Sequence, residues 1–336
     1  MADRVIVVGA TRGRQRVPAS EIMQMLGRAG RKHDGGECRA TIVVEEDFVE
    51  ELTKDMNTAD SYAVTSTFAN RNVMAFHILP EICSGNISNT TDARCWYSRS
   101  LGCAQGVKVD FGSVFELLAE QEAVFLLGDK YTATELGKVS SRFYFAASDL
   151  KAWRDSFTKL FDLGFEENDC AIAWAMACAP SMRTSGDFGR HWEVVERYKD
   201  GLPPGLDTAK SSTTSGTLWW HVLGGPPLGK MKNRALVFRA DVGRVVSALK
   251  ELDARVTHWN KTQFFDEMRW RARRGIPSSL AELCRIEGIT KSRAAYLGSV
   301  GIIGKEDIRS SIGQLKNEVD TSFYVVLKEI ADGIRQ

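Results

Sequence analysis

One octapeptide near the start of the sequence holds the residues best suited to chemistry. It reads Q-M-L-G-R-A-G-R and spans Gln24–Arg31. We predict a helix over Ala19–Arg31, on which Gln24, Arg28 and Arg31 are spaced i, i+4 and i+7 and project from one face. Two guanidiniums and an amide on one face suit a polyphosphate whose negative charge has to be stabilised. A solvated basic helix would account for two arginines alone, but it does not explain the whole octapeptide.

The residues around the octapeptide set the expected limits of this helix. Pro18 precedes it, and Ser20 can cap its N-terminus. Gly27 and Gly30 would each weaken an ordinary helix by roughly 1 kcal/mol relative to alanine. We therefore expect the backbone at these glycines to pack closely against a neighbour or a ligand.

The octapeptide resembles motif VI of superfamily-two helicases, in particular the Ski-like branch, whose signature there is Q-M-x-G-R-A-G-R. The resemblance implies that the segment lies in the second of two RecA-like lobes. It also implies that Arg28 and Arg31 act as arginine fingers on the terminal phosphates of ATP. Gln24 would share this catalytic role, and Gly27 would join these three residues in contacting the nucleotide.

Two short apolar runs flank the octapeptide and agree with the resemblance. Arg4–Gly9 and Ala40–Val44 both have the composition of a strand. A strand, a helix and a second strand form one repeat of a parallel α/β sheet.

Two motifs that ATP hydrolysis requires do not occur in the 336 residues. The sequence contains neither a phosphate loop of the pattern G-x-x-x-x-G-K-[ST] nor a D-E-x-H box. A lysine-bearing loop and a carboxylate that holds Mg²⁺ are both needed for phosphoryl transfer. We therefore expect this chain to resemble the C-terminal half of a motor. It would use ATP and Mg²⁺ only together with a separate polypeptide that supplies the N-terminal lobe and both motifs.

The composition is that of an ordinary globular protein, with 43% apolar and 26% charged residues and a net charge of +1. DNA binding would have to come from local patches, because the overall charge is nearly zero. Seven cysteines without a C-x-x-C pair argue against a disulfide framework or a zinc site. No signal peptide or long apolar run is present, so we expect an intracellular protein, cytoplasmic (nucleoid) or nuclear, without membrane contact.

The middle of the sequence predicts a small helical domain with a hairpin. An acidic, polar segment over Phe48–Asp60 is expected to be a linker. Three helices and a hairpin with a Gly-Asp turn make up the inventory of a winged helix, although many small domains share it. The expected segments are a helix from Val73 to Gly85, one that begins near Asn89–Asp92, one over Val114–Gln121, and a hairpin over Ala123–Thr132.

The order of the next segments adds to the helicase resemblance. Tyr131–Tyr144 is similar to the segment with which Ski-like helicases pass from a winged helix to a helical bundle, and the matching positions are Thr134, Gly137, Ser140 and Tyr144. A capped helix with a polar face would explain Thr134 equally well. Asp169–Ala179 is nearly all apolar and is expected to be buried. Most of Thr184–Lys232 is expected to be loop, with Trp219-Trp220 as a buried anchor.

A long amphipathic helix is predicted over Asp241–Trp259. Its apolar stripe of valines and leucines leaves Arg244, Arg255 and Trp259 on the opposite side. By resemblance, this helix lines the single-strand tunnel of a helicase, with Arg255 and Trp259 on bases and Arg244 on phosphate. The alternative is that Trp259 packs on the next helix, Phe264–Arg274, and this choice stays open.

Two short helices near the C-terminus predict a helix–hairpin–helix. Ser278–Ile286 and Ser292–Ser299 flank a tight turn, and basic residues precede them. Backbone N–H groups at the start of the second helix can hold a DNA phosphate without reading sequence. A hairpin that only packs on the bundle is the alternative. The expected DNA contacts are Gly288, Thr290, Lys291 and Arg293, with Thr290 as a possible N-cap in place of the family's second glycine.

We therefore predict a mostly α protein with a small α/β part. The expected domains are the end of a second RecA-like lobe (1–48), a winged helix (49–135), a helical ratchet bundle (136–265, with a loop-rich insertion at 184–232) and a helix–hairpin–helix domain (266–336).

The resemblance implies the C-terminal half of a Ski-like superfamily-two DNA helicase. It is most similar to the Holliday-junction-migration (Hjm) repair helicases and the helicase domain of polymerase theta. Single-stranded and forked DNA would be the substrates, in repair or recombination. Two hypotheses remain beside it: a non-catalytic DNA-binding accessory module, and a remnant of such a helicase.

Overall fold

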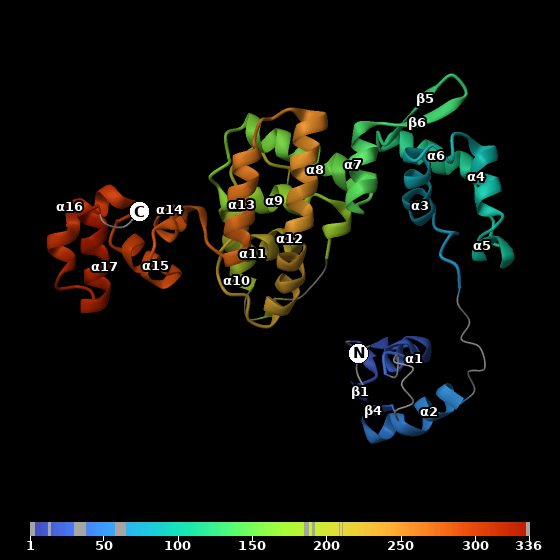
Figure 1. Ribbon diagram of the computed structural model, residues 1–336, viewed down its shortest axis with the longest axis horizontal. Helices are drawn as coiled ribbons and strands as arrows, with labels where there is room; N and C mark the ends of the chain where they lie inside the picture. The colour runs from blue at the N-terminus through green and yellow to red at the C-terminus, as the bar shows by residue number, and fades with distance from the viewer. Residues whose placement is uncertain are drawn as a thin grey trace. The chain divides into compact units, whose positions relative to one another are not determined.

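The computed structural model describes residues 4–12, 15–29, 38–57, 65–184, 188–189, 192–207, 209 and 211–333. The chain divides into two compact units, Met1–Ser66 and Thr67–Gln336. Helices dominate, and the described residues contain three sheets of two strands each (Figure 1). The prediction of a mostly α protein with a small α/β part is confirmed.

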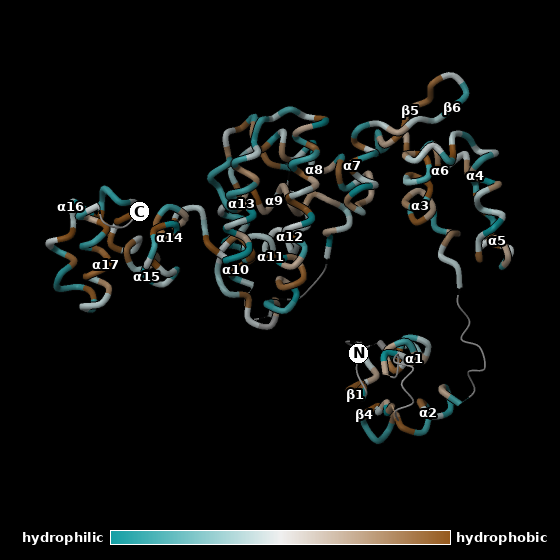
Figure 2. Tube along the Cα trace, in the orientation of Figure 1, coloured by the Kyte–Doolittle hydropathy of each residue, from teal (hydrophilic) through white to brown (hydrophobic). Residues whose placement is uncertain are grey.

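The N-terminal unit is built on a parallel pair of strands. Strand β1 (Arg4–Val8) pairs with β4 (Arg39–Val43) in register from Arg4↔Arg39 to Val8↔Val43. Figure 2 shows hydrophobic residues at both strands. Helix α1 (Ala19–Leu26) lies between them in sequence and contacts β1. The predicted order of strand, helix and parallel strand is therefore confirmed. Strands β2 (Thr11–Arg12) and β3 (Gln15–Arg16) form a small antiparallel ladder.

Helix α1 is shorter than predicted. It follows Pro18 as expected, but no side chain caps it, and Ser20 lies inside its first turn. It ends at Leu26 because Gly27 adopts φ −65° and ψ 4°, which is no longer helical. Gly27 is exposed, and Gly30 lies outside the described residues. Gly27 therefore does not pack closely on another described element, and its close approach to a ligand stays a prediction.

The expected linker after β4 is mostly a helix, α2 (Glu46–Asn57). Phe48, Leu52 and Met56 are half-buried and recur every four residues, which places them on one face. Acidic residues in the first turn favour the helix N-terminus. The many charged residues between these three apolar ones make the spacing hard to recognise in the sequence.

The second unit begins with short, capped helices and a hairpin, as predicted. Asn70, Asn89 and Asp110 accept backbone hydrogen bonds at three helix N-termini. In the hairpin, Leu127 pairs with Lys130 across the Gly128-Asp129 turn. The elements are α3 (Arg71–Cys83), α4 (Thr90–Tyr97), α5 (Leu101–Ala104), α6 (Phe111–Glu120), β5 (Val124–Leu127), β6 (Lys130–Ala133) and α7 (Glu135–Phe143).

A helical bundle follows, and α9 is its centre. Every residue of α9 from Cys170 to Ala177 is buried, and the helix packs on α8 and α11. The indoles of Trp153, Trp174 and Trp219 are at most 1% exposed, so the predicted buried anchor at Trp219 is confirmed. The elements are α8 (Ala147–Asp162), α9 (Asp169–Ala177), η1 (Pro180–Met182), α10 (Trp192–Asp200), α11 (Thr213–Val222), η3 (Gly229–Met231), α12 (Lys232–Leu252), η4 (Asp253–Thr257) and α13 (Thr262–Arg274).

The segment expected to be mostly loop contains two helices, α10 and α11. Helix α11 begins with serine and threonine residues that are typical of a loop, yet Ser212 caps it and Leu218 and Val222 bury its apolar face. Short helices of this kind are stabilised by tertiary packing more than by propensity, and the sequence does not reveal this.

Helix α12 begins earlier and ends earlier than predicted. It runs from Lys232 to Leu252, and one π-helical turn, η4, carries the chain to Thr257. The carboxylate of Asp253 then accepts the backbone N–H groups of Asn260 (2.9 Å) and Lys261 (2.8 Å). Trp259 therefore lies in the turn after the helix and not on its face.

The C-terminal helices have a hydrophobic core of their own. Leu283, Ile289, Leu297 and Phe323 belong to this cluster, which is separate from the bundle core. The two predicted helices are present with nearly the expected bounds. The elements are η5 (Ser278–Leu280), α14 (Ala281–Arg285), α15 (Lys291–Ser299), α16 (Lys305–Leu315) and α17 (Thr321–Ala331).

Candidate nucleotide-binding and DNA-binding residues

The described part of the octapeptide is exposed at the C-terminal end of α1. Gln24, Gly27 and Arg28 all face solvent, and Arg31 lies outside the described residues. Because the helix ends at Leu26, helical spacing does not set the position of Arg28. Its backbone N–H donates to the carbonyl of Met25 (3.1 Å) in a following turn. In the described part of the chain the Arg28 guanidinium has no ion pair, so it can reach an anionic ligand.

The sheet of the N-terminal unit leaves one apolar face uncovered. Ile6 and Val8 are 64% and 78% exposed, and Val43, the register partner of Val8, is 49% exposed. Val5 and Val7 point to the other face and are half-buried. Parallel sheets are normally covered on both faces.

Arg244 projects from α12 towards the turn after α7. Its guanidinium donates to both carboxylate oxygens of Asp241 (2.8 Å each) and to the carbonyl of Tyr144 (3.0 Å). It also lies 4.1 Å from the ring centroid of Phe145. The hydrogen bonds to Asp241 raise the pKa of Arg244 more than any other neighbour does. The side chain remains 43% exposed, so a phosphate can approach it.

Arg255 lies one turn of chain after Glu251 and joins α12 to α7. It contacts the carboxylates of Glu251 (2.5 Å) and Glu135 (3.2 Å), and Glu251 also binds Arg142. The Glu251 and Glu135 contacts raise the pKa of Arg255, in that order of effect. Arg255, the predicted DNA contact, therefore belongs to a cluster of charged side chains with Glu251, Glu135 and Arg142.

Trp259 packs chiefly on α8, and only in part on the next helix, α13, which was the alternative to base stacking. Its indole lies 5.2 Å from the ring of Phe161 and 6.1 Å from that of Phe265, and its Nε1 donates to Thr158 Oγ1 (3.0 Å). The side chain is half-buried. In the free chain the ring therefore already has aromatic neighbours and a hydrogen-bond partner.

The turn between α14 and α15 brings the four predicted hairpin residues together. Gly288 has φ +87°, a conformation that favours glycine, and Thr290 caps α15 by accepting the backbone N–H of Arg293 (3.4 Å). The predicted N-cap at Thr290 is therefore confirmed. The Lys291 ammonium donates to the carbonyl of Gly275, so it ties this turn to the end of α13.

Arg293 faces the C-terminal helices. It donates to the carbonyl of Gly288 (3.0 Å) and to Ser322 Oγ (3.3 Å), and it lies over the ring of Phe323 at 4.5 Å. Its guanidinium therefore stabilises the hairpin turn and connects it to α17. The structure brings all four hairpin residues into one turn, whereas Arg244, Arg255 and Trp259 lie along α12 and the turn after it.

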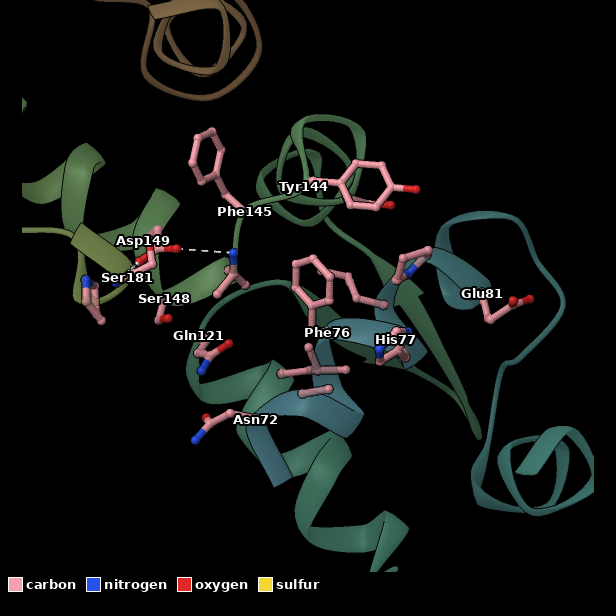
Figure 3. Close-up of a pocket in the computed structure, with 18 residues that line it drawn as sticks. Asn72, Phe76, His77, Glu81, Gln121, Tyr144, Phe145, Ser148, Asp149 and Ser181 are labelled. Atoms are coloured by element: carbon pink, nitrogen blue, oxygen red, sulfur yellow. Dashed lines mark hydrogen bonds between the residues drawn. The ribbon is translucent and has the colours of Figure 1, made fainter. Parts of the chain in front are cut away.

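One cavity escaped the sequence analysis. Eighteen residues line a space of about 510 Å³ beside α3, α6 and the turn between α7 and α8. Figure 3 shows the ring of Phe76 in the middle of this pocket, with Tyr144 above it and Gln121 and Asn72 nearby. The sequence carries no signal for this cavity, because its lining residues come from segments far apart in the chain.

No cluster of three or more His, Cys, Asp or Glu side chains suited to a metal ion occurs among the described residues. The described helices also include none with the length and apolarity needed to cross a membrane.

Burial raises the pKa of the Cys170 thiol to about 12, as expected of a cysteine that fills a core.

The chain is similar to one curated protein over most of its length. It is 23% identical to the ATP-dependent DNA helicase Hel308 of Pyrococcus horikoshii, and the similarity covers 92% of this chain. The match spans 47% of the relative, so the chain has about half of that protein's length. No family model matches the sequence. The similarity supports the relationship to the Ski-like superfamily-two helicases that the octapeptide and the later segments indicated.

Proposed function

We propose that this chain is the C-terminal half of an ATP-dependent DNA helicase that translocates on single-stranded DNA and unwinds forks. The observation that carries the proposal is the octapeptide Gln24–Arg31, which begins in α1 between two parallel strands and leaves Gln24 and Arg28 exposed. Similarity to a DNA helicase over 92% of the chain supports it. Among DNA helicases, we propose that it is most like the Hjm repair helicases and the polymerase theta helicase domain. Its role would then be in repair or recombination.

In this proposal, Arg28 and Arg31 act as arginine fingers, and Gln24 and Gly27 complete the nucleotide contacts. ATP and Mg²⁺ are held mainly by a lobe that carries the phosphate loop and the D-E-x-H box, motifs that these 336 residues do not contain. The uncovered sheet face at Ile6, Val8 and Val43 supports this, because it is the kind of surface that further α/β structure covers.

The remaining parts of the chain grip DNA. Residues 1–48 would be the end of a RecA-like lobe, 49–135 a winged helix, 136–265 a ratchet bundle and 266–336 a helix–hairpin–helix domain. Arg244 and Arg255 would contact the strand along α12, with Trp259 at the following turn. Gly288, Thr290, Lys291 and Arg293 would hold backbone phosphate, and the N-terminus of α15 favours an anion there.

A mixing experiment tests whether ATP hydrolysis requires both this chain and a polypeptide that carries the two missing motifs. The chain alone is expected to show no ATPase activity. Adding a polypeptide that carries both missing motifs, sought first in a neighbouring reading frame, should produce ATPase activity that DNA stimulates. Arg31→Ala and Arg28→Ala should each lower this kcat by about 10³-fold or more, since arginine fingers contribute on that scale. Arg309→Ala, on the exposed face of α16, is the control and should change nothing.

Two results would contradict the proposal. Robust ATP hydrolysis by the pure chain would show that the two motifs are not needed from elsewhere. Full stimulated activity in the Arg28→Ala and Arg31→Ala variants would remove the finger role. DNA binding without any stimulated ATPase in the mixture would instead favour the accessory module or the remnant. The lack of a phosphate loop in these 336 residues is the observation that favours these two alternatives.

A further inference from the structure

Tyr144 occupies a backbone position that is unusual for an aromatic residue. It ends α7 in the left-handed conformation (φ 56°, ψ 45°), and its N–H donates to the carbonyls of Ser140 and Ser141. Glycine or asparagine normally takes this position, because other residues are strained there by roughly 1–2 kcal/mol. The ring is nevertheless 72% exposed. Burial does not compensate for the strain, so a ligand for the ring would explain why tyrosine stands here.

Aromatic neighbours extend the surface of this ring into the pocket. The Phe76 centroid lies 6.2 Å from that of Tyr144 at a tilt of 54°, and His77 packs edge-on against Phe76 at 5.8 Å. Figure 3 shows Phe76 with Tyr144 above it and His77 beside it. The open face of Tyr144 offers a flat planar group a place to stack.

The pocket also contains side chains that can bind the edge of such a group. The side-chain amides of Asn72 and Gln121 and the hydroxyl of Ser148 line it, and none of these groups is hydrogen-bonded to another described residue. Amides present a donor and an acceptor side by side, which matches the edges of nucleobases. Asp149, by contrast, is occupied by the backbone N–H groups of Ala146 (3.2 Å) and Ser181 (2.8 Å).

Positive charge lies next to the ring. Arg142 is 62% exposed two residues before Tyr144, and Arg244 is bonded to the Tyr144 carbonyl from the other side. Both pair with exposed or half-buried carboxylates, which a phosphate can displace. A volume of about 510 Å³ lies within the range of small-ligand pockets and is large enough for one nucleotide.

We propose that Tyr144 and Phe76 receive one unstacked base of a DNA single strand. The Asn72 and Gln121 amides hold the edge of the base, and Arg142 and Arg244 contact its phosphate. This inference rests on the proposed DNA-binding function and adds a base-accepting site at the end of α7, which shares Arg244 with the candidate contacts on α12. In this site stacking is the main source of affinity, so the site accepts any base.

Two substitutions at Tyr144 separate the ring from the backbone. Tyr144→Asn removes the ring and keeps a residue that suits the left-handed conformation. Tyr144→Phe keeps the ring. Binding of fluorescein-labelled oligo(dT) to the whole chain is measured by anisotropy. We expect Tyr144→Asn to weaken binding about 5- to 150-fold, the effect of losing one stacked base. Tyr144→Phe should stay within about twofold of the wild type. Trp192→Ala, which removes another exposed aromatic ring, from α10, is the control.

Two further probes identify the contact. On an oligonucleotide of abasic sites, the Tyr144→Asn and wild-type chains should bind alike. A 4-thiothymidine oligonucleotide should crosslink to Tyr144 or Phe76, as located by mass spectrometry. Thermal unfolding checks that each variant is folded, and Asn72→Ala with Gln121→Ala provides a second test that leaves Tyr144 intact.

The outcomes distinguish this inference from the function on which it rests. If the wild type binds oligo(dT) and Tyr144→Asn binds equally well, the base site is overturned and the DNA-binding function stands. An equal loss on abasic DNA also overturns it, because stacking is then not involved. If the wild type does not bind oligo(dT), the proposed function itself fails. A pocket that accepts an apolar peptide segment and no DNA would give this last result.

Discussion

Arg271 shows how one buried charge connects three parts of the second unit. Its side chain is only 3% exposed and pairs with Asp169 of α9 at 2.5 Å. The other carboxylate oxygen of Asp169 accepts the backbone N–H of Ser278 (2.8 Å), where the C-terminal helices begin. One arginine of α13 thus helps to join the bundle to the hairpin segment.

We predict that Arg271→Ala lowers the free energy of unfolding by about 3–5 kcal/mol, because the buried carboxylate of Asp169 is left without its positive partner. Urea denaturation followed by circular dichroism measures the change. Arg309→Ala breaks an exposed pair with Glu306 in α16 and should cost less than about 1 kcal/mol. Equal losses in the two variants would show that the Arg271 pair has no special role.

Single residues also show what spacing alone leaves undecided. The sequence kept two roles of Trp259 open, and the structure shows its ring packed on Phe161 and Phe265 after the chain has turned, while its DNA contact stays a proposal. Asp253 fixes that turn by capping two backbone N–H groups that are seven and eight residues away. Local sequence gives no sign of such a contact.

Among the elements, the close contact between α7 and the backbone just before β5 explains why Gly137 is a glycine. A Cβ at Gly137 would lie 2.1 Å from the carbonyl oxygen of Ala123. The helix must therefore approach the backbone before the hairpin closely. Thr134, the N-cap of α7, donates its hydroxyl to the carbonyl of Glu122 (2.6 Å) at the same place.

Gly137→Ala should destabilise the chain by about 1–3 kcal/mol, since the backbone has to move to accept the methyl group. Gly313→Ala is the matched control. Gly313 lies in α16 with open space around it, and alanine there should stabilise the chain by about 0.5–1 kcal/mol. Thermal melts of both variants give the comparison. Stabilisation by Gly137→Ala would contradict the close approach.

For the molecule as a whole, DNA affinity has to come from local clusters of charge. The net charge is +1, so no global field attracts a polyanion. The candidate contacts on α12 and the hairpin are basic side chains that already neutralise nearby carboxylates or bind carbonyl groups. Binding is then expected to be weak at high salt and insensitive to sequence.

Lys291→Gln tests this local picture. If Lys291 contacts phosphate, its loss should reduce the slope of log affinity against log salt concentration by about 0.7 for single-stranded DNA. Lys199→Gln removes the same charge from α10 and should leave the slope unchanged. Titrations at several salt concentrations provide the measurement. Equal reductions in both variants would point to a diffuse field instead.

The sequence by itself determined the features that depend on short-range chemistry. It predicted the parallel strands, the Gly-Asp hairpin, the cap at Thr290 and the buried Trp219, because apolar spacing, turn residues and side-chain acceptors are all local signals. It also carried the octapeptide and the helicase resemblance.

Tertiary structure alone decided the rest. The helical state of Glu46–Asn57 and Thr213–Val222 depends on what their apolar faces pack against, and the early end of α12 depends on contacts made across a turn. The pocket at Tyr144 has the same origin. It exists because α3, α6 and the end of α7 meet in space, and no spacing along the chain encodes that meeting.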